Sequence, residues 1–166
     1  ILRGEPMMLG YWNKSEATAE TMKNGWLHTG DMVMKDAKGY FHWQARLKDT
    51  IRRAGENVSS VEVEGVLMEH PAVQVAAVVP VPDELRGEEV KAYLVLKAGH
   101  SPENTPPEMI LDYAREQLAY FKVPRYIEYV DDLLRTPSER VEKHKLAKAK
   151  PDLRVGSYDA VEKVWR

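Results

Sequence analysis

Residues 73–81 read VQVAAVVPV and are β-branched and almost wholly apolar. A short run of this kind predicts a strand that is buried on both faces of a sheet. Residues 89–97 read EVKAYLVLK and predict its partner strand. Shorter strands are expected over residues 50–53, before a tight turn at Gly55, and over residues 125–130, where the pattern alternates. These segments predict a small sheet.

Two helices are predicted to cover this sheet. Ser59 and Glu62 have the spacing of a capping box, S-x-x-E, which opens a helix, and Pro71 ends that helix. Its predicted inner face contains Val63, Val66, Leu67 and His70. Thr105 and Glu108 have the same capping spacing and open a second helix. The apolar face of the second helix contains Ile110, Leu111, Ala114 and Leu118.

The order of these elements predicts an α+β fold in which helices pack on a small β-sheet. A last basic helix is expected over residues 141–150 and a loose tail over residues 151–166. Residues 1–47 differ, because they predict a β-hairpin around a turn at Gly39, and a lone hairpin is marginal in water. We therefore expect 1–47 to be the end of a larger N-terminal domain, 48–150 to be a small domain, and 151–166 to be a C-terminal tail.

The composition narrows the functional classes. The chain has 166 residues, a net charge of -2 and no cysteine, which excludes a disulfide framework, a thiolate metal site and a cysteine nucleophile. A charge so near neutral argues against a nucleic-acid partner, and no apolar run approaches the roughly 18 residues that span a bilayer. We expect a cytoplasmic protein. The chain opens at Ile1 without an initiator methionine, so we also expect it to be cut from something longer.

Basic residues gather in two places. Residues 135–150 hold six Lys or Arg against two Glu, and a second cluster contains Arg46, Lys48, Arg52 and Arg53. Such runs are either solvated faces or anion sites, because Lys and Arg suit phosphate. Motifs for phosphate loops, dinucleotides, zinc proteases and serine hydrolases are missing, and the five histidines lack metal-ligand spacing. Composition and spacing alone therefore stop at an α+β domain with two basic clusters.

The segment GWLHTGD, residues 25–31, resembles a core motif of the adenylate-forming superfamily, which includes acyl-CoA synthetases, luciferases and the adenylation domains of peptide synthetases. Other segments resemble motifs of that family in the right order. They are MLGYWN at 8–13, GYF at 39–41, RLKD at 46–49, GENVS at 55–59, FKVP at 121–124 and RTPS at 135–138. The wording of GENVS is most similar to the crotonobetaine/carnitine-CoA ligase branch.

The resemblance implies a ligase that makes a thioester in two steps. A carboxylic acid attacks the α-phosphate of ATP to give acyl-AMP and pyrophosphate, and the thiol of coenzyme A then displaces AMP. Mg²⁺ accompanies ATP, with ligands outside this chain. In this family a large N-terminal domain holds the acyl pocket and the phosphate loop, and a small C-terminal domain rotates about a hinge between the two steps. The chain would comprise the end of the first domain and the whole mobile domain.

The resemblance also implies roles for single residues. Asp31 matches a carboxylate that accepts hydrogen bonds from the ribose hydroxyls, and Arg46 matches an arginine that contacts the nucleotide. Lys48 matches the hinge, and Gly55 lies in the loop that approaches the pantetheine arm of coenzyme A. The family's last motif usually ends Ser-Gly-Lys, and that lysine meets the negative charge that develops during adenylation. Arg140 stands at its position here.

Residues 138–140 read Ser-Glu-Arg and so depart from that motif. Arg140 keeps the positive charge, but as a bulky planar fork rather than a compact point charge. Glu139 adds a carboxylate beside the intended anion, which weakens the site unless Glu139 pairs with Arg135 or Arg140. Arg140 therefore substitutes for the lysine, or Lys143 reaches in from one helical turn later, or the first step is slow.

Three functions stay open at this point. The first is the C-terminal part of an AMP-forming acyl-CoA ligase, expected to be inactive on its own. The second keeps adenylation but passes the acyl group to a carrier-protein pantetheine arm or to oxygen. The third is a non-catalytic module that binds anions through the basic residues 140–150, which the net charge and the ordered motifs disfavour. The sequence names neither the carboxylic acid nor the oligomeric state.

Overall fold

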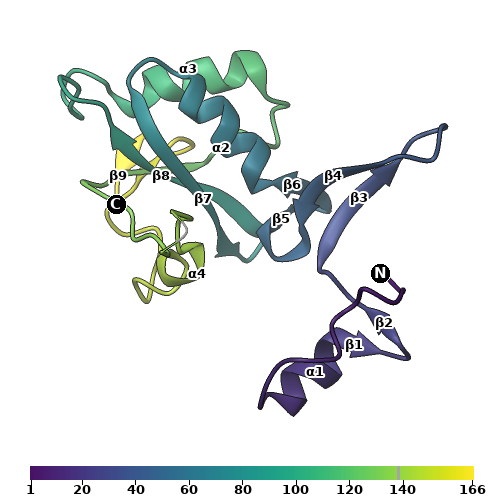
Figure 1. Cartoon of the computed structure of the whole chain (residues 1–166). Coiled ribbons are helices and arrows are strands. Elements are labelled where there is room, and N and C mark those ends of the chain that lie inside the picture. Colours follow the sequence, from purple (N-terminus) through teal and green to yellow (C-terminus); the bar gives the residue numbers. More distant parts are fainter. Residues whose placement is uncertain (138) are drawn as a thin grey trace. The chain divides into compact units, whose positions relative to one another are not determined.

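The chain forms two compact units, Ile1–Lys48 and Asp49–Arg166 (Figure 1). The structure is a computed structural model that describes residues 1–137 and 139–166, without the side chains of Gln44 and Lys48. The hinge role of Lys48 therefore rests on a side chain outside the described residues. The assignment of the chain's parts to a larger domain and a mobile domain stays a prediction.

The first unit consists of a short helix and two β-hairpins. Its elements are α1 (Ser15–Thr21), β1 (Met22–Lys23), β2 (Trp26–Leu27), β3 (Asp31–Lys35) and β4 (Phe41–Arg46), followed by the 3-10 turn η1 (Leu47–Asp49). The antiparallel β3–β4 pair confirms the predicted hairpin. Asp36 closes its turn by accepting the backbone N–H groups of Lys38 and Tyr40, each at 2.9 Å.

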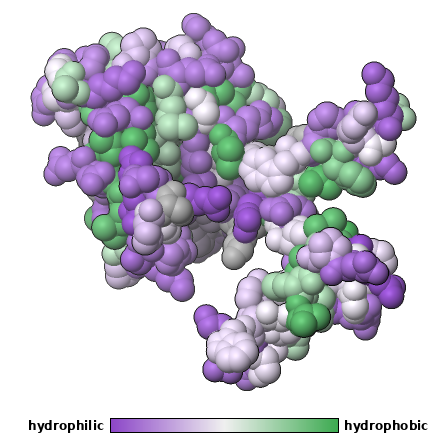
Figure 2. All heavy atoms as spheres, in the orientation of Figure 1, coloured by the Kyte–Doolittle hydropathy of each residue, from purple (hydrophilic) through white to green (hydrophobic). Residues whose placement is uncertain are grey.

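Apolar and aromatic side chains lie at the surface of this first unit (Figure 2). Leu9 and Trp12 are almost fully exposed, and Phe41 and Trp43 are at least half exposed. Within the described side chains of residues 1–48, Ala45 is the one buried apolar residue. The unit thus buries little apolar area of its own and gains little free energy from doing so.

The second unit is built on a mixed seven-stranded sheet. Its strands are β5 (Thr50–Arg53), β6 (Glu56–Ser59), β7 (Val73–Asp83), β8 (Gly87–Leu96), β9 (Tyr126–Tyr129), β10 (Tyr158–Asp159) and β11 (Val164–Trp165). The pairing order is β11, β10, β9, β8, β5, β6, and β7 also pairs with β8. The long antiparallel β7–β8 pair confirms the two central strands predicted from the sequence. β9 runs parallel to β8, because the chain crosses over through a helix between them.

Helices cover both faces of this sheet (Figure 1). They are α2 (Ser60–Glu69), α3 (Pro107–Gln117) and the short α4 (Lys143–Leu146). Val63 of α2 and Ile110 of α3 share one core with alternate residues of β7 and β8. The other face packs a second core in which Tyr93 and Val95 of β8 meet Leu146 of α4. The α+β expectation is confirmed, and the central strands are buried on both faces as predicted.

The two predicted capping boxes have different outcomes. Ser59 caps α2, since its hydroxyl accepts the Glu62 backbone N–H at 3.4 Å. The prediction for Thr105 is wrong, because Pro106 occupies the N-cap position and no side chain caps α3. The Thr105 hydroxyl instead bonds to the side chains of His100, at 2.9 Å, and Asn104, at 3.0 Å. The Thr105 hydroxyl therefore bonds within the preceding polar loop and does not cap the helix.

Two expectations for the C-terminal region are also wrong. The basic helix predicted over residues 141–150 is only four residues long. Residues 151–166 are not a loose tail, because β10 pairs with β9 and places Ser157 and Asp159 at 0% exposure. Asp159 pairs there with Arg125 and Arg166, at 3.1 and 2.9 Å. These buried partners hold the segment on the sheet edge.

Candidate functional site

Asp31 and Arg46 lie side by side in the first unit. They are register partners at one end of the β3–β4 ladder, and Arg46 Nε lies 3.2 Å from Asp31 Oδ1. The Trp43 indole N–H points to the same carboxylate oxygen at 3.4 Å. The Asp31 side chain is 25% exposed and the Arg46 side chain 48% exposed, so both charged groups remain within reach of a ligand. Two residues that the family resemblance singled out separately are therefore neighbours in space.

The backbone around Asp31 is fixed by local hydrogen bonds. The Asp31 N–H donates to Thr29 Oγ1 at 3.1 Å, and the Leu47 N–H donates to the Gly30 carbonyl at 2.8 Å. Thr29 and Gly30 belong to the GWLHTGD segment. Polar and turn residues of that segment therefore direct the carboxylate toward the strand that carries Arg46.

Gly55 lies in the second unit, in the two-residue turn between β5 and β6. Ala54 has φ of 51° and Gly55 has φ of 88°. Positive φ at both central residues is typical of hairpin turns whose backbone twist matches that of the flanking strands. The turn is held by a hydrogen bond from the Ala54 N–H to the Arg86 carbonyl at 2.8 Å. Beyond the adjoining residues, no described atom lies within 4 Å of a Cβ placed on Gly55, so the turn is open on that side. Its geometry would admit a thin ligand close to the backbone.

Arg140 lies at the closing end of a hairpin-like turn in the second unit. Arg135 and Val141 form an isolated antiparallel bridge, and the Thr136 N–H donates to the Arg140 carbonyl at 2.8 Å. The Arg140 N–H in turn donates to Thr136 Oγ1 at 3.2 Å. The Arg140 side chain is exposed. Ser138, the first residue of the Ser-Glu-Arg departure, lies outside the described residues.

Glu139 adopts a backbone conformation that glycine prefers. Its φ is 60°, in the left-handed region, at the position where the related motif usually has glycine. Its carboxylate lies 3.6 Å from Arg135 Nη1, so Glu139 pairs with Arg135. One of the two pairings that would relieve Glu139's opposition to a bound anion is therefore present.

The Lys143 side chain contacts α2. Its ammonium bonds to Ser60 Oγ at 2.9 Å and lies 2.7 Å from Glu64 Oε1. Lys143 is therefore already bound to α2, which disfavours the alternative in which it supplies the missing cation. Sequence reasoning missed Glu64, and its only signal was a carboxylate close to the apolar face of a predicted helix.

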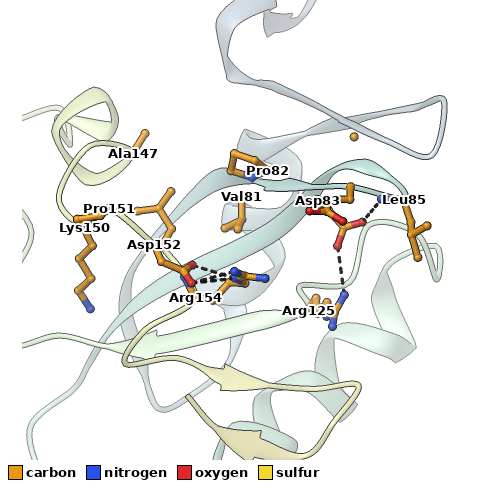
Figure 3. A pocket seen from close by; sticks show the side chains of 13 residues that line it. Val81, Pro82, Asp83, Leu85, Arg125, Ala147, Lys150, Pro151, Asp152 and Arg154 are labelled. Carbon is orange, nitrogen blue, oxygen red and sulfur yellow. Dashed lines mark hydrogen bonds and ion pairs between the residues drawn. The ribbon is translucent and has the colours of Figure 1, made fainter.

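The second unit also contains a pocket of about 750 Å³, between the β7–β8 end and residues 147–154 (Figure 3). Its cationic groups include Arg154, paired with Asp152 at 2.9 Å, and Arg125, paired with Asp83 at 3.5 Å. Asp31, Arg46, Gly55 and Arg140 do not line it, whereas Lys150, from the basic cluster at residues 135–150, does. This pocket is therefore not the site that the family resemblance implies for the nucleotide and coenzyme A.

Metal-ligand clusters and membrane-spanning helices are both missing from the described part of the chain. No group of three or more His, Asp or Glu side chains there has an arrangement that could hold a metal ion. The helices within the described residues are all too short or too polar to span a bilayer.

Residues 62–140 match the family described as the AMP-binding enzyme C-terminal domain. The chain belongs to the adenylate-forming superfamily and corresponds to its C-terminal part. The small mixed sheet with its helices is the fold of that domain.

Proteins similar to this chain include ligases that are several times longer. A probable CoA ligase of Humulus lupulus is 46% identical over 147 residues, which are 88% of this chain and 26% of that protein. An amide bond synthetase from Marinactinospora thermotolerans is 40% identical with a TM-score of 0.74, over 89% of this chain and 30% of that one.

An o-succinylbenzoate CoA synthetase from Bacillus subtilis, in complex with its acyl-adenylate intermediate, is 35% identical with a TM-score of 0.76, over 90% of this chain and 30% of that one. The chain spans about a quarter of the length of the curated relatives it matches.

Proposed function

We propose that this chain works as the C-terminal part of an ATP-dependent acyl-CoA ligase, which joins a carboxylic acid to coenzyme A through acyl-AMP. The observation that carries the proposal is the pairing of Asp31 with Arg46 at 3.2 Å, both within segments that resemble the family's nucleotide motifs. A carboxylate with two acceptor oxygens suits the vicinal hydroxyls of ribose, and a half-exposed guanidinium suits phosphate.

The second unit would contribute to both chemical steps. In the proposal, Arg140 lowers the energy of the negative charge that develops when the carboxylate attacks the α-phosphate. The open turn at Gly55 lies beside the pantetheine arm when the thiol attacks acyl-AMP. ATP brings Mg²⁺ with it, and we expect the ligands of that ion, the acyl pocket and the phosphate loop to belong to an adenylating domain that precedes this chain.

The surface of the first unit supports the presence of a preceding domain. Exposed Leu9, Trp12, Phe41 and Trp43 leave an apolar surface on a unit with little core. Surfaces of this kind mark contacts with another protein surface. We infer that this unit packs on the preceding domain of the same polypeptide.

The test uses the complete polypeptide with ATP and a panel of carboxylic acids. Pyrophosphate release that depends on the acid reports the first step, and thioester formation with coenzyme A reports the second. Arg140→Ala should slow acyl-AMP formation by at least about 30-fold, since a contact important to the transition state is worth roughly 2 kcal/mol or more. Arg140→Lys should keep most of the rate. If Arg140→Ala stays within about threefold of wild type, Arg140 is not the catalytic cation.

A second candidate changes only the acceptor of the acyl group. The similarity to an amide bond synthetase, at 40% identity, favours testing an amine acceptor alongside coenzyme A. Carrier-protein pantetheine and oxygen complete the set. Acyl-AMP formation without any thioester product from free coenzyme A would select this candidate.

A further inference from the structure

The turn that carries Arg140 is tied to the rest of the second unit on both sides. On its N-terminal side, Leu133 is 2% exposed and packs in the core beneath α4. On its C-terminal side, the Glu142 N–H donates to the Leu134 carbonyl at 2.9 Å, and Lys143 begins α4. Arg140 therefore lies on a short loop whose two ends are fixed to the rest of the unit.

Lys143, which directly follows this loop, binds two side chains of α2. Its Nζ lies 2.7 Å from Glu64 Oε1 and 2.9 Å from Ser60 Oγ. Glu64 is only 9% exposed, and its Oε1 also accepts the Val78 backbone N–H of β7 at 2.6 Å. One buried carboxylate thus joins α2, β7 and the start of α4.

The Glu64 carboxylate depends on these partners. Burial raises the pKa of Glu64, and the ion pair with Lys143 opposes that rise. A buried charge that loses its partner is strongly unfavourable, so the contact is retained while the unit is folded. The contact between Lys143 and Glu64 combines charge with directional hydrogen bonds. It therefore fixes the position of the Lys143 ammonium group.

Lys143 follows Arg140 by three positions along the chain, a reach of at most about 11 Å. A displacement of Lys143 therefore moves the backbone of Arg140 directly. We propose that Glu64 and Lys143 are positioning residues for Arg140, and that their ion pair sets the place of the cation used in acyl-AMP formation. This inference rests on the proposed function, in which Arg140 is that cation.

The experiment compares the two half-reactions in the complete enzyme. Lys143→Met removes the anchor, and the double variant Glu64→Gln/Lys143→Met removes it without leaving a buried charge, while the introduced amide oxygen still accepts the Val78 N–H. Lys150→Met is the control for the loss of a part-buried lysine elsewhere in the same unit, because Lys150 pairs with Glu128 at 2.7 Å and Glu128 keeps Lys91 as a partner. Thermal unfolding identifies any variant that fails to fold.

Acyl-AMP formation should fall about 10- to 100-fold in both anchor variants, the cost of misplacing a catalytic group by a fraction of an ångström to about 1 Å. Thioester formation from added acyl-AMP should change less than about twofold, and Lys143→Arg should restore the first step. The Lys150→Met control should change neither step. Equal losses in both steps of the double variant would assign the pair a general structural role and overturn the proposal.

A double-mutant cycle separates positioning from direct catalysis. In an Arg140→Ala background, Lys143→Met should have no further effect on acyl-AMP formation, because there is no cation left to position. Multiplying effects would make Lys143 an independent cation and overturn the proposal. If Arg140→Ala slows the first step but the anchor variants leave it unchanged, the positioning role is wrong while the proposed function stands. If Arg140→Ala has no effect, the proposed role of Arg140 fails, and this inference fails with it.

Discussion

Asp31 and Arg46 are register partners in the β3–β4 hairpin, with Arg46 Nε 3.2 Å from the Asp31 carboxylate. The pair lies at the surface, where an ion pair contributes little to folding. Substitutions at Asp31 can therefore test the proposed nucleotide role without a large loss of stability.

Asp31→Ala should raise the KM for ATP at least about tenfold in the complete enzyme, since it removes the charged acceptor of hydrogen bonds from the ribose hydroxyls. The free energy of unfolding of this chain should change by less than about 1 kcal/mol. Asp36→Ala is the control on the same hairpin. It should destabilise the chain by removing the turn acceptor, with the KM for ATP unchanged. An unaltered KM in Asp31→Ala would contradict the ribose-binding role.

Glu139→Gly should stabilise the chain by about 0.5–1 kcal/mol. Glu139 has φ of 60°, which is unfavourable for any residue with a Cβ and costs glycine nothing. The lost contact with Arg135 spans 3.6 Å between exposed groups and contributes little. Urea unfolding measures the change. Glu139→Ala removes the same carboxylate but keeps the strained backbone, so a gain in this control would show that charge, and not φ, is responsible.

Two glycines with equally open surroundings should respond to alanine in opposite directions. A methyl group added to Gly65 or to Gly55 would meet no described atom within 4 Å beyond its immediate neighbours, but Gly65 lies within α2 and Gly55 has φ of 88°. Gly65→Ala should stabilise by about 0.5–1 kcal/mol through helix propensity. Gly55→Ala should destabilise by about 1 kcal/mol or more, because alanine is strained there. Calorimetric unfolding of both variants tests the pair, and equal shifts in Tm would contradict the backbone argument.

Asp159 should make the chain sensitive to acid. Burial raises its pKa, but hydrogen bonds from Arg125, Arg166 and two backbone N–H groups outweigh burial and bring the value to about 2. The folded pKa is below the unfolded value of 3.8, so the stabilisation is present above about pH 4. It is lost as the pH falls toward about 2, and it amounts to roughly 2 kcal/mol.

Asp159→Asn should therefore be less stable than wild type at neutral pH and show a flatter decline of stability between about pH 5 and 2.5. Urea unfolding at several pH values measures both. Glu162→Gln serves as the control, because Glu162 contacts the same two arginines from an exposed position. A decline as steep as wild type in Asp159→Asn would assign the acid sensitivity to another group.

Short-range patterns in the sequence were sufficient for much of this fold. The apolar run at residues 73–81, its partner at 89–97 and the Ser59 cap all appear as predicted, because each depends on neighbours a few residues away. The family motifs likewise single out Asp31 and Arg46. Their contact spans one hairpin, and hairpin register follows from the turn.

Tertiary structure decided what local pattern leaves undefined. The Thr105 side chain bonds to His100 and does not cap α3. Residues 151–166 pack on the sheet, where Asp159 forms a buried pair with Arg125. The tie between Glu64 and Lys143 spans 79 residues of chain. A charged residue in a sequence shows that it needs a partner or water, but not which partner the folded chain brings to it. The position of Arg140 is accordingly a property of the packed unit, whereas its charge is a property of the sequence.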